Sequence, residues 1–278
     1  MSVRVIAATV SLLAAAVLPA YAVDRSPADL VLVQRGTLPI ILTAPHGGHE
    51  AVPNVAPRNI EGKPRGGSAF EITTDGNTDI IAQNIAATIK VLTGKEPYLV
   101  IARFQRLYID ANRPPEIAFD NPIARPFYDY YHRTVRSFVD EIRANYPAGL
   151  LIDVHGQVKD PNVLMRGTQN GRSIRSLLAR SGVTAVTGPK GIYGQLAANG
   201  FAIFPSNDVP PGGTSENAGF SGGYTSSLYG SHNANGIDAV SFEFGTKYRQ
   251  KAAVDKSAKD AGAAVVEFYK AYLSPPRR

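Results

Sequence analysis

Short apolar segments alternate with stretches of helical periodicity, and this alternation constrains the fold more than any other feature of the sequence. The segments that we expect to be strands, because they are short and rich in apolar and β-branched residues, are residues 38–43, 97–102, 149–154 and 237–244. The stretches with an apolar helical face are residues 77–92, 122–145 and about 249–272. Strands that alternate with helices predict a three-layer α/β sandwich with a mixed, mostly parallel central sheet.

The N-terminus predicts the destination of the chain. Arg4 precedes an apolar run from Val5 to Leu18, and the pattern Ala-Tyr-Ala follows shortly after it. This order is typical of a secretory signal peptide, which we place at residues 1–22. A membrane span needs roughly 20 apolar residues, so we expect no stable membrane anchor after cleavage. The protein is therefore expected to be exported, to the periplasm or the extracellular space, with residues 23–278 as one catalytic α/β domain.

Composition excludes several classes of protein. The chain has no cysteine, so a disulfide scaffold and a cysteine-ligated metal are both excluded. Its 29 Lys and Arg residues outnumber 23 Asp and Glu residues, but they form no basic run and no interleaved aromatic motif. We therefore expect no nucleic-acid partner. Two long loops rich in Gly, Pro and polar residues, 47–68 and 205–226, are expected to carry function.

Two of the predicted strands lead into a histidine that is followed by glycine. These residues are His46 and His155. In open α/β sheets, ligands gather beyond the carboxyl ends of the strands. Two imidazoles from separate strands together with a carboxylate make the three-ligand, open site of a catalytic zinc. A pair of hydrogen-bonded core histidines fits the same placement.

The third metal ligand is less clear from local pattern. Asp75 directly precedes a predicted helix, so local pattern favours a helix N-cap, whose carboxylate accepts from free backbone N–H groups. His49 and Glu50 compete for the ligand position because both follow His46 closely.

Candidate catalytic and binding residues lie in two further places. Glu243 interrupts an otherwise apolar strand, where a buried carboxylate would suit a general base; an outward-facing strand residue is the alternative. Asn112 and Arg113 precede Pro114-Pro115, and a guanidinium on a rigid loop suits bidentate recognition of a carboxylate. Exposed ion pairing is the alternative for this arginine.

Several motifs occur in an order that resembles the N-formylglutamate amidohydrolase family, over about Leu38 to Glu243. They are Ala44-Pro45-His46-Gly47-Gly48, Thr74-Asp75-Gly76-Asn77-Thr78, Arg106 to Arg113, Asp153-Val154-His155-Gly156, and Gly222-Gly223-Tyr224 followed by Phe242-Glu243. The resemblance implies a zinc-carboxypeptidase-like fold that holds one zinc per chain. Peptidases of that fold carry a carboxylate three residues after the first histidine, where this chain has His49.

The resemblance also implies roles for individual residues. The implied metal ligands are His46, Asp75 and His155, and the implied catalytic residues are Glu243 and Arg113. The implied substrate-binding residues are Asn112, Arg113 and Arg106, while Asp110 is expected to orient Arg113 or Arg106.

These patterns together predict an exported zinc-dependent amidohydrolase. Its partner would be a small molecule or peptide in which the scissile amide lies near a free carboxylate. Because export is expected, the family's named substrate is not carried over.

Two other functions compete with this one. An exported binding protein for an acidic amino acid or cell-wall peptide would use the arginine but not the metal. A serine hydrolase would use Ser221, with Asp238 and His232 downstream, but no strand precedes that serine, no helical pattern follows it and the histidine precedes the acid. His132 is expected to pack in its helix or support the site, and His232 to be solvated.

Overall fold

A computed structural model describes residues 25–59 and 70–273 of the chain. One seven-stranded sheet lies at its centre, with strand order β1-β3-β2-β4-β7-β5-β6. β1 is antiparallel to β3 and β5 is antiparallel to β7, while the other neighbouring pairs are parallel. The strands are β1 (Val31–Gln34), β2 (Ile40–Ala44), β3 (Tyr98–Ala102), β4 (Leu150–Gln157), β5 (Leu164–Gly167), β6 (Ile203–Phe204) and β7 (Asp238–Gly245).

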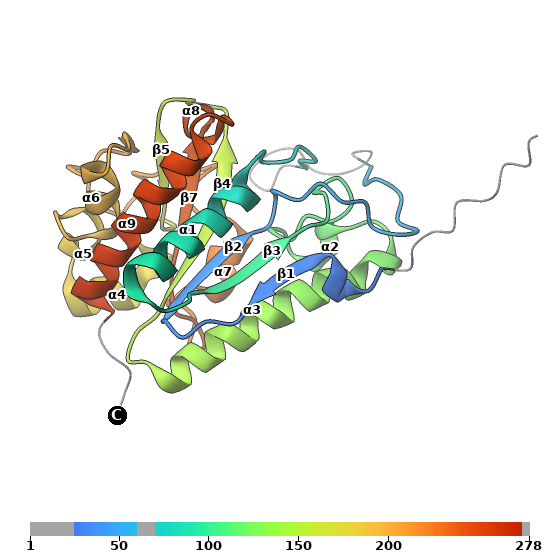
Figure 1. The fold of residues 1–278 in the computed structure, drawn as a ribbon, viewed down its shortest axis with the longest axis horizontal. Coiled ribbons are helices and arrows are strands. Elements are labelled where there is room, and N and C mark those ends of the chain that lie inside the picture. Colours follow the sequence, from blue (N-terminus) through green and yellow to red (C-terminus); the bar gives the residue numbers. More distant parts are fainter. Residues whose placement is uncertain (1–24, 60–69, 274–278) are drawn as a thin grey trace, which may run out of the picture.

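Helices cover both faces of the sheet, so the predicted three-layer sandwich with a mixed, mostly parallel sheet is confirmed. α1 and α9 cross one face, and the long helix α3 lies against the other (Figure 1). The helices are α1 (Thr78–Thr93), α2 (Pro115–Ala118), α3 (Arg125–Asn145), α4 (Arg175–Ser181), α5 (Thr184–Thr187), α6 (Ile192–Ala198), α7 (Tyr224–Tyr229), α8 (Thr246–Arg249) and α9 (Val254–Tyr272).

The central strands are apolar on both faces because each face has its own core. Ile40 and Leu42 point into the core beneath α1 and α9, whereas Ile41 between them points into the core beneath α3. Alternate side chains of a strand point to opposite faces, so a strand with cores on both sides is apolar throughout. Because β2, β4 and β7 are parallel neighbours, their carboxyl ends lie next to one another.

The four predicted strands and the first two predicted helices match observed elements, but the third helix was placed wrongly. It begins at Val254, not near Arg249, because Gln250 has extended backbone angles (φ −63°, ψ 145°) that end α8. The pattern missed β1, β5 and β6, which are four, four and two residues long. The predicted signal peptide and residues 60–69 of the first long loop lie outside the described residues.

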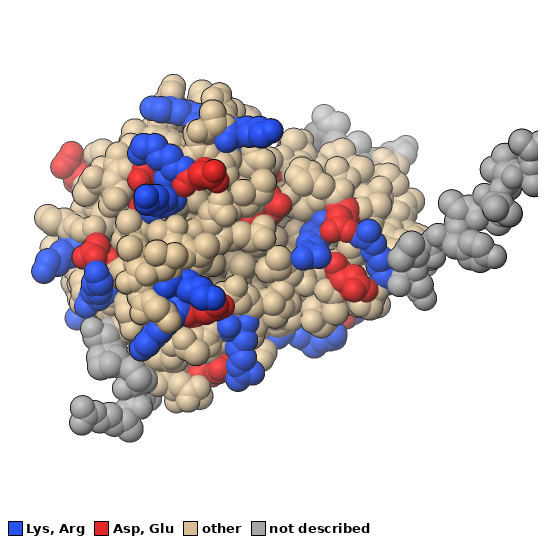
Figure 2. Space-filling model, in the orientation of Figure 1, with Lys and Arg blue, Asp and Glu red and all other residues tan. Residues whose placement is uncertain are grey.

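The surface carries basic and acidic groups side by side. On the face in Figure 2, Lys and Arg side chains form small groups, several of them beside acidic ones. Ion pairs such as Lys256 with Asp260 and Arg35 with Glu141 bring opposite charges together on the surface of the protein. Across the described ranges, none of the helices combines the length and apolar character that a membrane crossing requires.

Candidate metal centre

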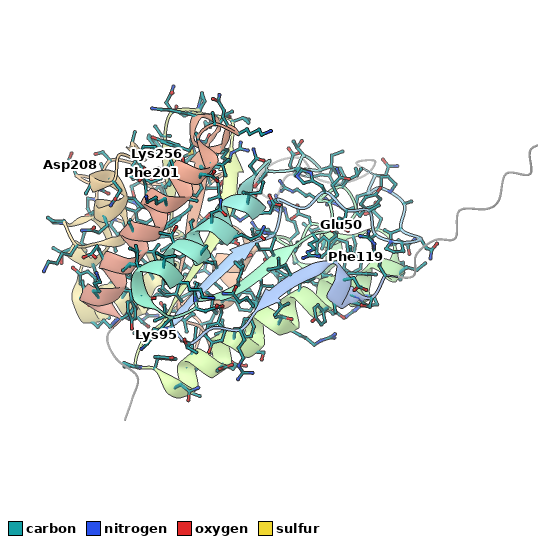
Figure 3. The ribbon with its side chains drawn as sticks, viewed as in Figure 1. Glu50, Lys95, Phe119, Phe201, Asp208 and Lys256 are labelled. Atoms are coloured by element: carbon teal, nitrogen blue, oxygen red, sulfur yellow. The ribbon has the colours of Figure 1, made fainter. Side chains whose placement is uncertain are left out.

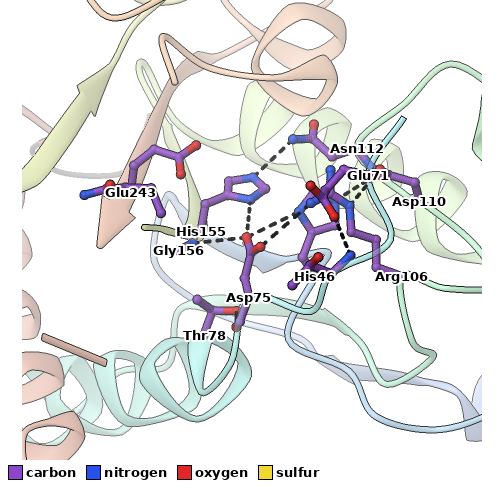
Figure 4. A network of polar contacts seen from close by, with 12 residues as sticks. His46, Glu71, Asp75, Thr78, Arg106, Asp110, Asn112, His155, Gly156 and Glu243 are labelled. Carbon is purple, nitrogen blue, oxygen red and sulfur yellow. Dashed lines mark hydrogen bonds and ion pairs between the residues drawn. The ribbon is translucent and has the colours of Figure 1, made fainter. Parts of the chain in front are cut away.

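Three predicted metal ligands meet at one end of the sheet. His46 follows β2 by two residues, His155 lies in the neighbouring strand β4, and Asp75 lies in the segment before α1. All three side chains are buried, and one ligand atom from each lies within 4.8 Å of the others. Figure 4 shows the two imidazoles on either side of the Asp75 carboxylate. The fold therefore brings together residues that are 29 to 109 positions apart (75 − 46 and 155 − 46).

Each imidazole presents the same nitrogen to Asp75. The Nδ1 atoms of His46 and His155 lie 3.4 and 3.2 Å from Asp75 Oδ2. Their Nε2 atoms lie 2.7 Å from carboxylate oxygens of Asp110 and Asp153, respectively. A carboxylate can only accept, so each Nε2 carries a hydrogen, and Nδ1, which faces Asp75, is the nitrogen of each ring that could bind a metal ion.

This donor set fits a metal ion. The Nδ1 atom of His46 is buried and makes no hydrogen bond within the described part of the chain. A buried polar atom without a partner is rare and calls for an unseen one. Two imidazole nitrogens and a carboxylate are the ligands that zinc takes in catalytic sites. The alternative of two hydrogen-bonded core histidines does not account for the free Nδ1.

The two carboxylates behind the histidines are held ionised. Burial by itself would raise their pKa values, but the charges around them outweigh it. The guanidinium of Arg106 and the ring of His46 hold the pKa of Asp110 well below its usual value. His155 and the hydroxyl of Thr43, which donates to Asp153 Oδ1 at 2.6 Å, lower the pKa of Asp153. Ionised carboxylates of this kind keep the imidazoles in one orientation.

Asp75 is not a helix cap, so the interpretation that local pattern favoured is wrong. The position that caps α1 is Asn77, in a left-handed conformation (φ 68°). The Asp75 carboxylate instead accepts from the backbone N–H of Gly156, the residue after His155, at 3.1 Å. Burial opposes its ionisation, yet His46 and His155 hold the pKa of Asp75 far below its usual value.

The two competitors for the third ligand lie elsewhere. His49 is exposed. Glu50, labelled in Figure 3, forms an ion pair with Arg25, and its backbone bridges to Phe104 just beyond β3. Neither residue belongs to the buried cluster, which contains Asp75.

Glu243 lies beside the cluster because β4 and β7 are neighbours in the sheet. It is the register partner of His155. Its side chain is only 7% exposed, so the alternative of an outward-facing residue is wrong. Burial, with a further contribution from Asp75 and Asp153, raises the pKa of Glu243 to about 7, although His155 opposes the shift. A carboxylate with a pKa near neutrality can both accept and release a proton.

Asn112 packs into the same site. Its Nδ2 lies 3.3 Å from His155 Nε2, and its Oδ1 accepts from the backbone N–H of Thr225 at 2.8 Å. The backbone of the second long loop passes so close that a Cβ on Gly223 would lie 2.1 Å from Asn112 Nδ2. A glycine is therefore required at 223, and the loop that contains it forms one wall of the site.

Arg113 stands at the edge of the site, half-buried. Its Nη1 donates to the carbonyl of Asn112 at 2.8 Å, and its own carbonyl accepts from Tyr128 Oη at 2.8 Å. The backbone on both sides of the guanidinium is thus held in place.

Arg106 occupies a different environment from that of Arg113. It is buried, its Nε donates to Asp110 Oδ2 at 2.8 Å, and its Nη1 lies 3.8 Å from Asp75 Oδ1. Arg106 therefore contacts both Asp75, a candidate metal ligand, and Asp110, which orients it as expected. Sequence reasoning missed Arg58, which donates to the Arg106 carbonyl through Nε at 3.1 Å. A single arginine in a Gly- and Pro-rich loop gives no signal of this role.

The serine-hydrolase residues are not assembled. A short helix, α7, does begin three residues after Ser221, contrary to the sequence pattern, but the preceding strand, β6, ends at Phe204, far from Ser221 in the loop. His232 accepts from Arg172 Nη2 at 3.1 Å, and Asp238 pairs with Arg180 at 2.7 Å. Among the described contacts, none joins Ser221 to either residue.

His132 is a packing residue, as predicted. Its Nε2 donates to the carbonyl of Ala111 at 3.0 Å, its Nδ1 lies 2.9 Å from Tyr229 Oη, and the ring of Tyr128 lies 4.4 Å from its own. Burial lowers its pKa to about 4, so the ring is neutral at physiological pH.

Asp153 had no predicted role beyond its place in a motif, yet a signal was present. Residues two apart in a strand share a face, so the carboxylate of Asp153 stands on the same side as the ring of His155.

We expect Asp110→Asn and Asp153→Asn each to weaken zinc binding by about 10- to 100-fold, because a neutral amide orients the imidazole less firmly. Titration against a competing chelator measures this. Asp208→Asn, at an exposed loop position, is the control, and unchanged affinity in both buried variants would contradict the assignment.

Comparison with known proteins identifies the fold. A search with models of known protein families finds no match, and neither does a comparison with curated protein sequences. The chain is similar to the crystal structure of N-formylglutamate amidohydrolase from Ralstonia eutropha, with a TM-score of 0.58 at 12% identity over 87% of this chain and 97% of that one. The resemblance seen in the motifs is thereby confirmed at the level of the fold.

More distant matches include a bacteriophage poly-γ-glutamate hydrolase, with a TM-score of 0.42 and 16% identity over 87% of this chain and 89% of that one. Another is succinylglutamate desuccinylase from Chromobacterium violaceum, with a TM-score of 0.38 and 12% identity over 86% of this chain and 63% of that one.

Proposed function

We propose that this protein is an exported, zinc-dependent amidohydrolase that cleaves an amide or peptide bond near a free carboxylate. The observation that carries the proposal is the convergence of two buried Nδ1 atoms and the Asp75 carboxylate, with Glu243 beside them. A fold shared with an amidohydrolase supports the same class of reaction. Export is supported by the signal-peptide pattern of residues 1–22.

The chemistry divides between a metal ion and the chain. A zinc ion held by His46, Asp75 and His155 would polarise the scissile carbonyl and lower the pKa of a water molecule. Glu243 accepts the proton of the attacking water and then delivers it to the leaving nitrogen. Its burial in a strand beside His155 keeps the carboxylate in one place for both transfers.

The expected substrate feature is a carboxylate next to the scissile bond. Arg113 is charged, lies at the edge of the site and is followed by a proline pair that restricts its backbone. Asn112 connects this loop to His155, so a carboxylate on Arg113 would lie close to the metal ligands. Arg106 contributes through Asp110 and Asp75, which it holds in place.

The proposal is tested by hydrolysis assays on the purified protein, before and after removal of metal with a chelator. The substrate panel contains N-acyl amino acids, γ-glutamyl peptides and peptidoglycan fragments, each with its free carboxylate and as the corresponding amide. We expect turnover of at least one free acid, loss of turnover after chelation, and recovery with zinc. Metal-free protein that binds such ligands without cleaving them would favour a binding protein instead.

Arg113→Lys tests binding of the substrate carboxylate by Arg113, which we call the carboxylate clamp, independently of metal binding. A lysine keeps the charge but cannot make two parallel hydrogen bonds to a carboxylate. We expect kcat/KM to fall about tenfold or more on free acids and to change little on the matched amides. Arg125→Lys, on an exposed side chain, is the control. Equal losses on acids and amides would contradict the clamp.

A further inference from the structure

We propose that Arg249 is a positioning residue for the candidate metal centre. Its side chain connects the segments that carry Asp75, His155 and Glu243 by hydrogen bonds. The inference rests on the proposed function, since it concerns the geometry of that site. Arg249 is the last residue of α8, directly after β7, and its side chain is half-buried.

The guanidinium donates to one carbonyl in each of three segments. Nη1 donates to Gly76 O at 2.9 Å, Nε to Phe244 O at 2.9 Å, and Nη2 to Gln157 O at 3.3 Å. Gly76 follows Asp75 directly and Phe244 follows Glu243 directly, while Gln157 is two residues beyond His155. One planar group thus bonds to the backbone beside two proposed ligands and the proposed base.

Gly156 leaves the space that this arrangement needs. A Cβ at position 156 would lie 2.5 Å from both Cζ and Nε of Arg249. Gly156 lies inside β4 without a positive φ, so no turn requires a glycine at this position. Its small size therefore serves the close approach of the guanidinium. The same glycine donates its N–H to Asp75 Oδ2, so ligand and guanidinium meet at one backbone position.

A second bond connects the two segments in the opposite direction. Asn77 Nδ2 donates to the carbonyl of Arg249 at 2.7 Å. Asn77 has φ 68°, a left-handed conformation that asparagine tolerates better than most residues. The segment that carries Asp75 is therefore bonded to both the side chain and the backbone of Arg249.

Asp75 needs such a tie more than the other site residues do. His155 and Glu243 are held opposite each other by the ladder between β4 and β7. Asp75 lies outside any strand, and its backbone N–H is bonded to the carbonyl of His46 on the other side of the site. The bonds from Arg249 link it to β4 and β7, which sets its distance from His155.

The experiment measures metal binding to Arg249→Lys and Asn77→Gly. Lysine keeps the charge but cannot span three carbonyls as a planar group does. Glycine adopts the backbone angles of Asn77 without strain and removes only its side-chain bond, so this milder variant should fold. The control is Arg136→Lys, because Arg136 donates to the carbonyls of Asn235 and Leu228 away from the metal cluster.

We expect zinc affinity, measured by competition with a chelator, to fall about 10- to 100-fold in Arg249→Lys and about threefold or more in Asn77→Gly. The absorption spectrum of bound Co²⁺ should also change in Arg249→Lys, since it reports ligand geometry. Arg136→Lys should keep the zinc affinity and Co²⁺ spectrum of the wild type, even if its thermal unfolding temperature falls as much as that of Arg249→Lys. A purely structural role for Arg249 would leave the affinity and spectrum unchanged.

The outcomes separate this inference from the proposed function. Wild-type protein that takes up neither Zn²⁺ nor Co²⁺ overturns the metal site, and with it the role of Arg249. Wild-type protein that binds both ions, with affinity and spectrum unchanged in Arg249→Lys and Asn77→Gly, overturns the positioning role alone.

Discussion

Purified protein is expected to carry about one zinc ion per chain, and His46→Ala and His155→Ala are each expected to lose it. Both imidazoles are buried. A carboxylate that accepts from Nε2 holds each ring with its Nδ1 toward Asp75. Alanine removes one of three ligands, so the remaining two hold the ion weakly. Elemental analysis of the dialysed protein measures the loss directly, and activity on the substrate panel should fall with it.

Two histidines outside the cluster provide matched controls for this experiment. His49 is exposed and His232 contacts Arg172, so His49→Ala and His232→Ala should retain the metal. Circular dichroism of all four variants separates loss of the ion from loss of the fold. Full zinc content in folded His46→Ala or His155→Ala would overturn the assignment of that histidine.

Glu243→Gln is expected to retain zinc while turnover falls about a hundredfold or more. Glutamine has nearly the same size and can still hydrogen bond, but it cannot accept the proton of the attacking water. Zinc already has three protein ligands in the proposed site, so the carboxylate is not needed to hold it. KM should change little, because the side chain acts on the reacting atoms and not on the carboxylate of the substrate.

The control for this variant is Glu141→Gln. Glu141 lies on α3, outside the candidate metal site, and accepts a hydrogen bond from Tyr98 Oη at 2.7 Å. Loss of its carboxylate charge should leave turnover unchanged. Parallel loss of zinc and activity in Glu243→Gln would make the residue a ligand. Full activity would place the base elsewhere.

Strands and helices with strong local patterns could be predicted, while short or edge elements could not. The apolar runs that became β2, β3, β4 and β7 are buried on both faces, so their composition alone marks them. β1 is a short edge strand with exposed positions, although Val31 to Val33 are apolar, and β6 contains only two residues. These strands form because neighbouring strands offer hydrogen-bonding partners, which no local pattern records.

The role of Asp75 shows why local reading of a site can fail. An aspartate before a helix is favoured as a cap because the helix N–H groups are its nearest donors in sequence. In the folded chain, Gly156 and His155 are nearer in space and take the carboxylate away from the helix. Nothing within a few residues of Asp75 encodes that competition.

The sequence by itself determined the α/β alternation, the two histidines at strand ends and the carboxylate inside an apolar strand, because each is a property of neighbouring residues. The tertiary structure alone decided the strand order that sets Glu243 opposite His155. It also decided which nitrogen of each imidazole faces Asp75 and how Arg249 connects three segments. Those features depend on contacts between residues up to 173 positions apart, and only the folded chain brings such residues within reach of a hydrogen bond.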